Sequence, residues 1–213
     1  MSFCDLLINI TISSITGVGA SFFIWWLTFK TWTPEITFAE AISRLQTTEN
    51  PSGLKYRFKF ENSGRRNIID IEAIVRLRIK GLRAGFPDNW EVVYLPTSSL
   101  DYKKIAIVRP VSGSHVRPVF EIKAYDCAYF EKPIFPQATR DLAIAHQLTV
   151  DHILDLGSET NLQVLLLGYD QFSGSRKFFE TKEMSQVDIA TGGYQLRGLD
   201  IAMNTPEEGE DFN

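Results

Sequence analysis

A stretch of 24 uncharged residues near the N-terminus constrains this chain more than any other feature. It runs from Leu6 to Phe29, between Asp5 and Lys30, and reads LLINITISSITGVGASFFIWWLTF. As an α-helix it would be ~36 Å long at ~1.5 Å per residue, slightly longer than the ~30 Å hydrocarbon core of a bilayer. The sequence therefore predicts a transmembrane helix within residues 1–33, which ends before Pro34.

A cleaved signal peptide is the main alternative for this segment. Such a peptide needs a basic start, a shorter apolar run and a cleavage site of small residues. The run follows Asp5, and the bulky Trp25–Trp26 pair stands where cleavage would be expected. An uncleaved anchor fits better, with aromatic residues forming a belt at the interface where the helix leaves the bilayer. These residues are Phe22, Phe23, Trp25, Trp26, Phe29 and Trp32.

Small and polar residues recur along one side of the predicted helix. Asn9, Ser13, Gly17 and Ser21 are spaced four positions apart. In lipid such a stripe lets helices approach closely, and Asn or Ser can form hydrogen bonds across the contact. We favour self-association of the helices through this face, with a polar path between them as a further interpretation. The alternative is a moderately polar anchor whose Ser and Thr hydroxyls bond to their own backbone.

The orientation follows from the charges beside the helix. Lys30 and Arg44 come after it, and Asp5 is the only charged side chain before it. Because basic residues favour the cytoplasmic side, the domain after the helix is expected in the cytoplasm.

Charge and cysteine content exclude two other classes. The net charge is −4, but four acidic residues lie in residues 205–213, which we expect to be a disordered tail: Glu207, Glu208, Glu210 and Asp211. The remainder is close to neutral, which argues against a nucleic-acid partner, since such proteins need a basic face. The two cysteines, Cys4 and Cys127, give no disulfide framework.

Residues 34–204 have the alternation of antiparallel strands with one buried and one wet face. From Leu54 to Phe60, apolar side chains alternate with basic ones. The clearest strand runs from Ile69 to Ile79, with Ile69, Ile71, Ala73, Val75, Leu77 and Ile79 on one side. The predicted wet face carries Lys55, Arg57, Lys59, Arg76, Arg78 and Lys80.

Several shorter apolar runs complete the predicted domain, with a turn at Asn62-Ser63-Gly64. The further strands are expected at Ile36–Leu45, Glu91–Leu95, Lys104–Val108, Val119–Ala124, Leu162–Tyr169, Phe178–Glu180 and Gln186–Ile189. Only Ala138–Leu156 has helical spacing, with Thr139 as its N-cap. The predicted fold class is mainly β: an antiparallel β-sandwich preceded by one transmembrane α-helix.

Two segments resemble the cytoplasmic domain of inward-rectifier potassium channels. The first is Tyr56–Leu77, YRFKFENSGRRNIIDIEAIVRL, which has that family's strand, polar turn and acidic, alternating second strand. The second comprises Leu165–Asp170, the hairpin through Ser173–Ser175, and Asp188–Tyr194, which are similar to its closing strands. Thr191 replaces the tryptophan of the family's final motif. The resemblance covers residues 36–201, with extra sequence between Pro133 and Thr160.

The resemblance implies an immunoglobulin-like (E-set) sandwich that assembles as a tetramer below a membrane pore. The family's outer membrane helix, pore loop and filter have no counterpart here, so an ordinary potassium channel is excluded unless a partner subunit supplies the pore. The family binds anionic lipid headgroups through basic residues near the membrane, and the corresponding positions are Lys30, Arg65 and Arg66. The alternative for Arg65 and Arg66 is a pair of solvated turn residues.

Signals for an enzyme are weak. The three histidines, His115, His146 and His152, lack metal-site spacing, and no G-x-S-x-G or phosphate-loop motif occurs. Ser112–His115 is typical of a Gly-Ser turn, and Asp141 and Glu159 do not form a carboxylate pair. No catalytic residue, metal or cofactor is predicted.

These features together predict a single-pass membrane receptor or effector. Its β domain would form a homo-oligomer and couple an anionic lipid or a small-molecule ligand to the membrane helix. Ion leakage or membrane disruption would be the output. The alternative is a passive membrane-anchored module that binds or scaffolds a partner, such as a channel subunit.

Overall fold

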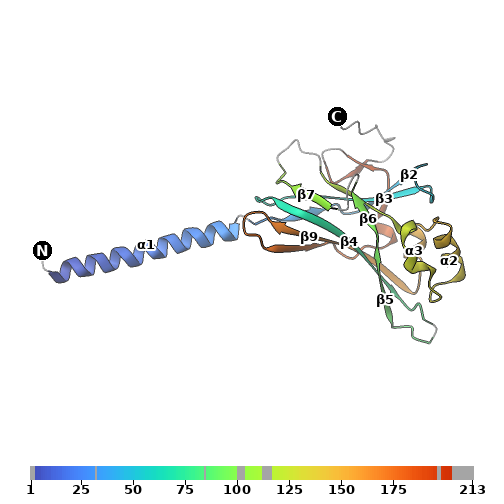
Figure 1. Cartoon of the computed structure of the whole chain (residues 1–213), viewed down its shortest axis with the longest axis horizontal. Coiled ribbons are helices and arrows are strands. Elements are labelled where there is room, and N and C mark those ends of the chain that lie inside the picture. Colours follow the sequence, from blue (N-terminus) through green and yellow to red (C-terminus); the bar gives the residue numbers. More distant parts are fainter. Residues whose placement is uncertain are drawn as a thin grey trace.

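A long N-terminal helix projects from a β domain (Figure 1). The computed structural model describes residues 3–31, 33–83, 85–99, 104–111, 117–195 and 198–202, and the side chains of α1 from Thr11 to Thr28. Helix α1 spans Phe3–Thr31, and its segment Thr11–Thr28 is long and apolar enough to cross a membrane, with none of it buried. The prediction of one N-terminal apolar helix of membrane-spanning length is confirmed.

Two sheets form the β domain. The first has the order β11-β2-β3-β8-β6, with β1 paired to β3, and the second has the order β10-β9-β4-β5, with β7 paired to β4. The strands of the first sheet are β1 (Ile36–Phe38), β2 (Ile42–Gln46), β3 (Leu54–Asn62), β6 (Thr97–Ser99), β8 (Val119–Ile122) and β11 (Ile189–Thr191). Those of the second are β4 (Ile68–Lys80), β5 (Trp90–Leu95), β7 (Lys104–Val108), β9 (Glu159–Asp170) and β10 (Arg176–Glu180). A small ribbon pairs β12 (Gly193–Tyr194) with β13 (Ile201–Ala202).

The inner faces of the two sheets share one hydrophobic core. Phe58 and Phe60 each stack on Phe120 in the first sheet, with ring centroids 5.5 and 6.0 Å apart. Fully buried Leu77 and Val164 of the second sheet belong to the same cluster. The prediction of a mainly β, sandwich-like fold with antiparallel sheets is therefore confirmed, although β11 runs parallel to β2.

A bulge near the start of β4 changes which isoleucine is buried. Asp70 has a φ of 53°, and the pairing of β4 with β9 shifts between Ile69 and Glu72. Because the bulge reverses the alternation, Ile68 is buried and Ile69 is only partly covered. The predicted alternation is correct from Ile71 onward, whereas its first member, Ile69, was assigned to the wrong side.

The predicted wet face needs one correction, at Lys59. This side chain is only 3 % exposed, and its Nζ donates a hydrogen bond of 2.7 Å to the carbonyl oxygen of Gln195. The cause is the returning C-terminal segment, in which the Tyr194 hydroxyl also donates to the Arg57 carbonyl at 3.3 Å. The other five basic residues of that face remain partly exposed.

The predicted helix Ala138–Leu156 is two shorter helices. Helix α2 spans Gln137–Ile144 and α3 spans Val150–Leu154. Between them His146 has a φ of 54°, a left-handed conformation that a continuous helix does not allow. Thr139 is buried within α2 rather than acting as its N-cap, whereas Thr149 caps α3. Both helices lie at the end of the domain remote from α1 (Figure 1).

Several predicted strand limits also differ. The segment Ile36–Leu45 is divided into β1 and β2, and Gln186–Asp188 forms a 3-10 turn, η3, before β11 begins. Ala124 begins η1 (Ala124–Asp126), which η2 (Ala128–Glu131) follows. Trp32, the segment 112–116 and the acidic tail 205–213 lie outside the described residues.

Candidate functional site

The segment that joins α1 to β1 is bound to the turn between β3 and β4. The amide of Gly64 donates to the Glu35 carbonyl, and the amide of Arg65 donates to the Thr33 carbonyl, both at 3.2 Å. A Cβ on Gly64 would lie 2.3 Å from the Glu35 nitrogen and 2.5 Å from the Thr33 oxygen. Only glycine allows so close an approach. The predicted Asn62-Ser63-Gly64 turn is thus the point where the helix linker meets the domain.

Asn62 fixes the shape of this turn. Its side chain is fully buried, and its Nδ2 donates to the carbonyls of Arg66 at 2.7 Å and Val108 at 3.1 Å. Its Oδ1 accepts from the amide of Gly64 at 3.1 Å. These bonds satisfy the buried amide and hold the turn against the end of β7.

Arg66 connects the turn to α1 and to the β9–β10 hairpin. Its side chain is 8 % exposed, and its Nη1 lies 3.3 Å from Oδ2 of Asp170. Its Nη2 donates to the Thr28 carbonyl at 3.5 Å, and its guanidinium lies 4.4 Å from the centre of the Phe172 ring. Because the last carbonyls of a helix lack partners within it, a cation there is favourable. We call Thr28, Arg66, Asp170 and Phe172 the junction.

Asp170 is the acidic residue of the junction, at the end of β9. It accepts hydrogen bonds from the Phe172 amide at 3.0 Å and from the Ser173 hydroxyl at 2.8 Å, in addition to the ion pair. Burial by itself would raise the pKa of Asp170, but these two hydrogen bonds and Arg66 lower that pKa below its usual value. The carboxylate is therefore ionised at neutral pH and holds the guanidinium in place.

Two of the three predicted lipid-binding cations, Arg65 and Arg66, have different environments in the structure. Arg66 is buried in the junction, so its interpretation as a solvated turn residue is wrong. Arg65 is exposed in the same turn, beside the linker. The side chain of Lys30 lies outside the described part of α1. A role for these residues in lipid binding stays a prediction.

The described residues of the predicted association face are exposed. Ser13, Gly17 and Ser21 are exposed, and the side chain of Asn9 lies outside the described set. Thr16 and Thr28 donate from their hydroxyls to the carbonyls of Ile12 and Ile24. These two threonines thus behave as the alternative interpretation of the helix expects.

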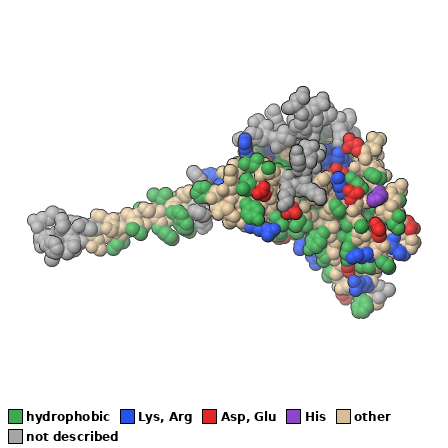
Figure 2. All heavy atoms as spheres, viewed as in Figure 1, with side chains coloured by type: hydrophobic (Ala, Val, Ile, Leu, Met, Phe, Trp, Pro, Cys, Tyr) green, Lys and Arg blue, Asp and Glu red, His purple; other side chains and the backbone are tan. Residues whose placement is uncertain are grey.

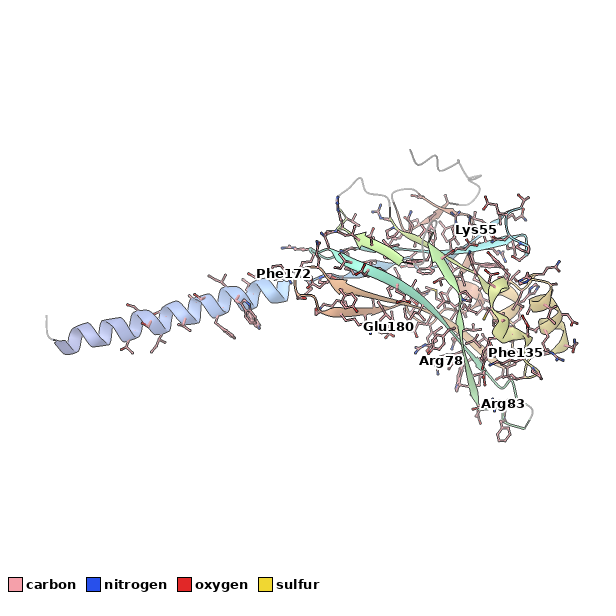
Figure 3. The ribbon with its side chains drawn as sticks, viewed as in Figure 1. Lys55, Arg78, Arg83, Phe135, Phe172 and Glu180 are labelled. Atoms are coloured by element: carbon pink, nitrogen blue, oxygen red, sulfur yellow. The ribbon has the colours of Figure 1, made fainter. Side chains whose placement is uncertain are left out.

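The described side chains of the predicted aromatic belt lie just before the junction. Trp25 and Trp26 are exposed, one turn or less before Thr28, and the Phe22 and Trp25 ring centroids are 5.8 Å apart. Figure 3 shows Phe172 at the end of the domain from which α1 emerges.

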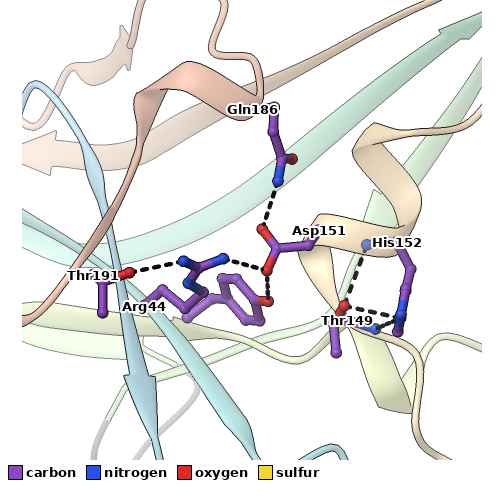
Figure 4. Close-up of polar contacts among 7 residues, drawn as sticks. Arg44, Thr149, Asp151, His152, Gln186 and Thr191 are labelled. Carbon is purple, nitrogen blue, oxygen red and sulfur yellow. Dashed lines mark hydrogen bonds and ion pairs between the residues drawn. The ribbon is translucent and has the colours of Figure 1, made fainter.

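A second polar cluster lies around Asp151 of α3 (Figure 4). Its carboxylate accepts from Arg44 Nη1 at 2.9 Å, the Tyr56 hydroxyl at 2.7 Å and Gln186 Nε2 at 3.0 Å. Arg44 also donates to the Thr191 hydroxyl at 2.7 Å. Burial opposes ionisation, yet the hydrogen bonds from Tyr56 and Arg44 lower the pKa of Asp151. A carboxylate with three donors is a poor proton acceptor, and this cluster fastens α3 to β2, β3 and η3.

The described histidines have structural contacts. His146 Nδ1 lies 3.0 Å from the Tyr125 carbonyl oxygen, and His152 Nδ1 contacts Thr149 in the cap of α3. Within the described ranges, no group of three or more His, Cys, Asp or Glu side chains is arranged to hold a metal ion. His115 lies outside these ranges. The expectation that the chain is not an enzyme stays a prediction.

Sequence reasoning missed Asp170 and Phe172 as site residues. Arg66 and Asp170 stand 104 positions apart, and no local pattern indicates that they pair. The available signal is the run Asp170–Gly174, DQFSG, since an aspartate at a strand end before Ser and Gly is typical of a turn with a side-chain acceptor.

Comparison with known proteins does not assign the chain to a family. No protein-family model matches the chain, and no curated protein is significantly similar to it. The fold and the junction define the class of protein: a mainly β sandwich domain joined, through a buried ion pair, to a helix long and apolar enough to cross a membrane.

Proposed function

We propose that this chain is a single-pass membrane receptor or effector whose β domain controls its membrane helix. The observation that carries the proposal is the position of Arg66. One buried guanidinium contacts the last turn of α1, the carboxylate at the end of β9 and the ring of Phe172. If the domain moves relative to the helix, the Arg66 guanidinium loses its contact either with the helix or with the domain. The junction is thus suited to couple two arrangements of domain and helix.

The finer fold type belongs to this proposal. An immunoglobulin-like (E-set) domain similar to that of inward-rectifier channels is supported by the two packed sheets and by the resemblance of residues 56–77 and 165–194. On this basis the domains form a homo-oligomer, with four subunits as the number implied by the resemblance. The stripe Asn9, Ser13, Gly17 and Ser21 brings the helices together.

The lipid partner acts near the linker, on the cytoplasmic side. Arg65 is exposed beside Thr33 and, with Lys30, suits contact with an anionic headgroup. Arg66 is already paired with Asp170, so we assign it to coupling rather than to a direct lipid contact. A headgroup at Arg65 would act on the turn that holds Arg66.

The output we propose is ion leakage or membrane disruption by the associated helices. The second candidate is a passive anchor that scaffolds a partner protein. The side chains of Asn62 and Asp170 each make several hydrogen bonds at the junction between helix and domain. Such bonds hold the two parts in one arrangement, as a fixed tether requires, and this favours the second candidate.

Ion flux in liposomes separates the two functions. The full-length protein is reconstituted with and without anionic lipid, and flux is measured for wild type, Arg66→Gln and Arg83→Gln. Arg83 is an exposed arginine at the far end of the domain, so it is a matched control (Figure 3). We expect the flux of wild type and of Arg83→Gln to depend on anionic lipid. In Arg66→Gln we expect the flux to be the same with and without anionic lipid. Absence of flux in every lipid would contradict the effector and leave the scaffold.

Arg65→Gln tests the lipid contact separately. If Arg65 binds an anionic headgroup, this variant needs a higher fraction of anionic lipid for the same flux, while its junction stays intact. An unchanged lipid requirement would remove Arg65 from the site.

A further inference from the structure

The contact of Phe172 with Arg66 in the junction does not explain why most of the Phe172 side chain is exposed. It is the most exposed of the described phenylalanines, at 70 %, and lies in the turn between β9 and β10. The neighbouring Asp170 is buried, and its oxygens fix the turn through the Phe172 amide and the Ser173 hydroxyl. The hairpin therefore presents an aromatic ring outward on a rigid support.

The position of Phe172 relative to α1 places it near the membrane surface. Its ring lies 4.4 Å from the guanidinium of Arg66, which reaches the carbonyl of Thr28. Thr28 is two to three residues beyond Trp26 and Trp25, a rise of ~3–5 Å along the helix. The headgroup layer on each side of a bilayer is ~5–8 Å thick. If the tryptophans lie at the interface, Phe172 lies at headgroup level.

Other apolar side chains continue this surface along the hairpin. Tyr169 and Phe178 are exposed, and the strand register pairs Phe178 with Leu167, two residues from Tyr169 on the same side of β9. Exposed charges of both signs stand nearby, with Arg65 and Arg176 against Glu35 and Asp70. Figure 2 shows hydrophobic, basic and acidic side chains together at the end of the domain near α1. Neither sign dominates, so apolar insertion rather than charge is the basis of the contact.

We infer that Phe172 inserts into the headgroup region of the bilayer that α1 enters, so that the β9–β10 hairpin holds the domain at a fixed tilt. This inference rests on the proposed membrane anchor. The ring acts as an interfacial aromatic residue, as the tryptophans of the helix do. Because the contact is apolar, it does not require anionic lipid.

A spin label measures the depth of this turn in the full-length chain. The parent carries Cys4→Ser and keeps Cys127, which is buried. Labels are placed at Gln171→Cys, which leaves the Phe172 ring in place, and at Phe172→Cys. Phe86→Cys is the matched control, since Phe86 is 66 % exposed in the distal β4–β5 loop. The parent should take up no label.

The labelled proteins are reconstituted in vesicles of zwitterionic lipid alone, and collisions with oxygen and with a water-soluble nickel chelate are compared. We expect oxygen to dominate at positions 171 and 172 and the chelate to dominate at position 86. Chelate access at 171 and 172 equal to that at 86 would overturn the contact. Protection from both reagents would also overturn it and would indicate a second copy over the hairpin. Failure of the protein to float with the vesicles would refute the anchor itself.

Discussion

Asp170 balances the charge of Arg66 in the junction, so its removal takes a carboxylate away from a buried cation. Asp170→Asn keeps one side-chain oxygen, which can still accept from the Phe172 amide. It replaces the oxygen that accepts from Ser173 and pairs with Arg66 by an amide NH2 group, and it removes the negative charge. Breaking one side of a buried ion pair costs about 3–5 kcal/mol. We expect the free energy of unfolding of the full chain in detergent micelles to fall by that order, as measured by urea denaturation.

The control for this change is Asp88→Asn. Asp88 pairs with Lys80 at 3.2 Å, but its side chain is 89 % exposed. An exposed pair contributes at most about 1 kcal/mol, so the loss should be small. Equal decreases in the free energy of unfolding of the two variants would show that the buried ion pair of the junction contributes no more than an exposed one.

Asp151 predicts how stability depends on pH. Its pKa in the folded protein is lowered, whereas an unfolded aspartate has a pKa of about 3.9. The stabilisation is therefore fully present above that unfolded value and is lost as the pH falls through the lower folded value. We expect the melting temperature of wild type to drop more steeply below pH ~4 than that of Asp151→Asn, by thermal denaturation followed by circular dichroism. Parallel curves would contradict the prediction.

At this scale the sequence predicts the turn that carries Arg66 but not the contacts of the junction. The Asn62–Gly64 turn follows from local residues, and the resemblance implies that Arg66, just after it, lies near the membrane. The partner Asp170 does not, because an ion pair between residues 104 positions apart is set by the packing of β4 on β9. For the same reason the pattern could not show that Lys59 is covered by the Gln195 segment.

The secondary-structure elements were predictable wherever one face is buried and the other wet. Strands β3 and β4 follow from alternation, because their inner side chains fill the core. The bulge at Asp70 and the break at His146 were not predictable, since each depends on a single non-glycine residue with positive φ, which a periodic pattern does not reveal. Short edge strands such as β6 have too few residues to show a period.

Helix α1 gives the prediction that belongs to this scale. A Cβ at Gly17 would have no atom within 4 Å, so a larger side chain fits the single chain without a clash. If the helices associate through the predicted face, Ser13→Leu with Gly17→Leu should lower the oligomer size in detergent, as measured by light scattering. Ile15→Leu on an exposed position outside the stripe is the control. An unchanged size in the double variant would count against helix association.

The arrangement of the whole molecule makes its orientation testable. The predicted cytoplasmic domain places the β4–β5 loop inside the cell and the N-terminus outside. In the Cys4→Ser parent, Phe86→Cys should react with a membrane-impermeant maleimide only after the cells are opened. Ser2→Cys should react in intact cells. The reverse pattern would place the domain outside.

The parallel pairing of β11 with β2 has a consequence for how this molecule is made. Thr191 lies opposite Arg44, although 147 positions separate them in the chain. At ~5–20 residues per second a ribosome needs roughly 7–30 seconds to add that stretch, and α1 has emerged well before it is complete. The first sheet therefore gains its last edge only after the apolar helix has had time to reach lipid. We expect the sandwich to close on a nascent chain already held at the bilayer.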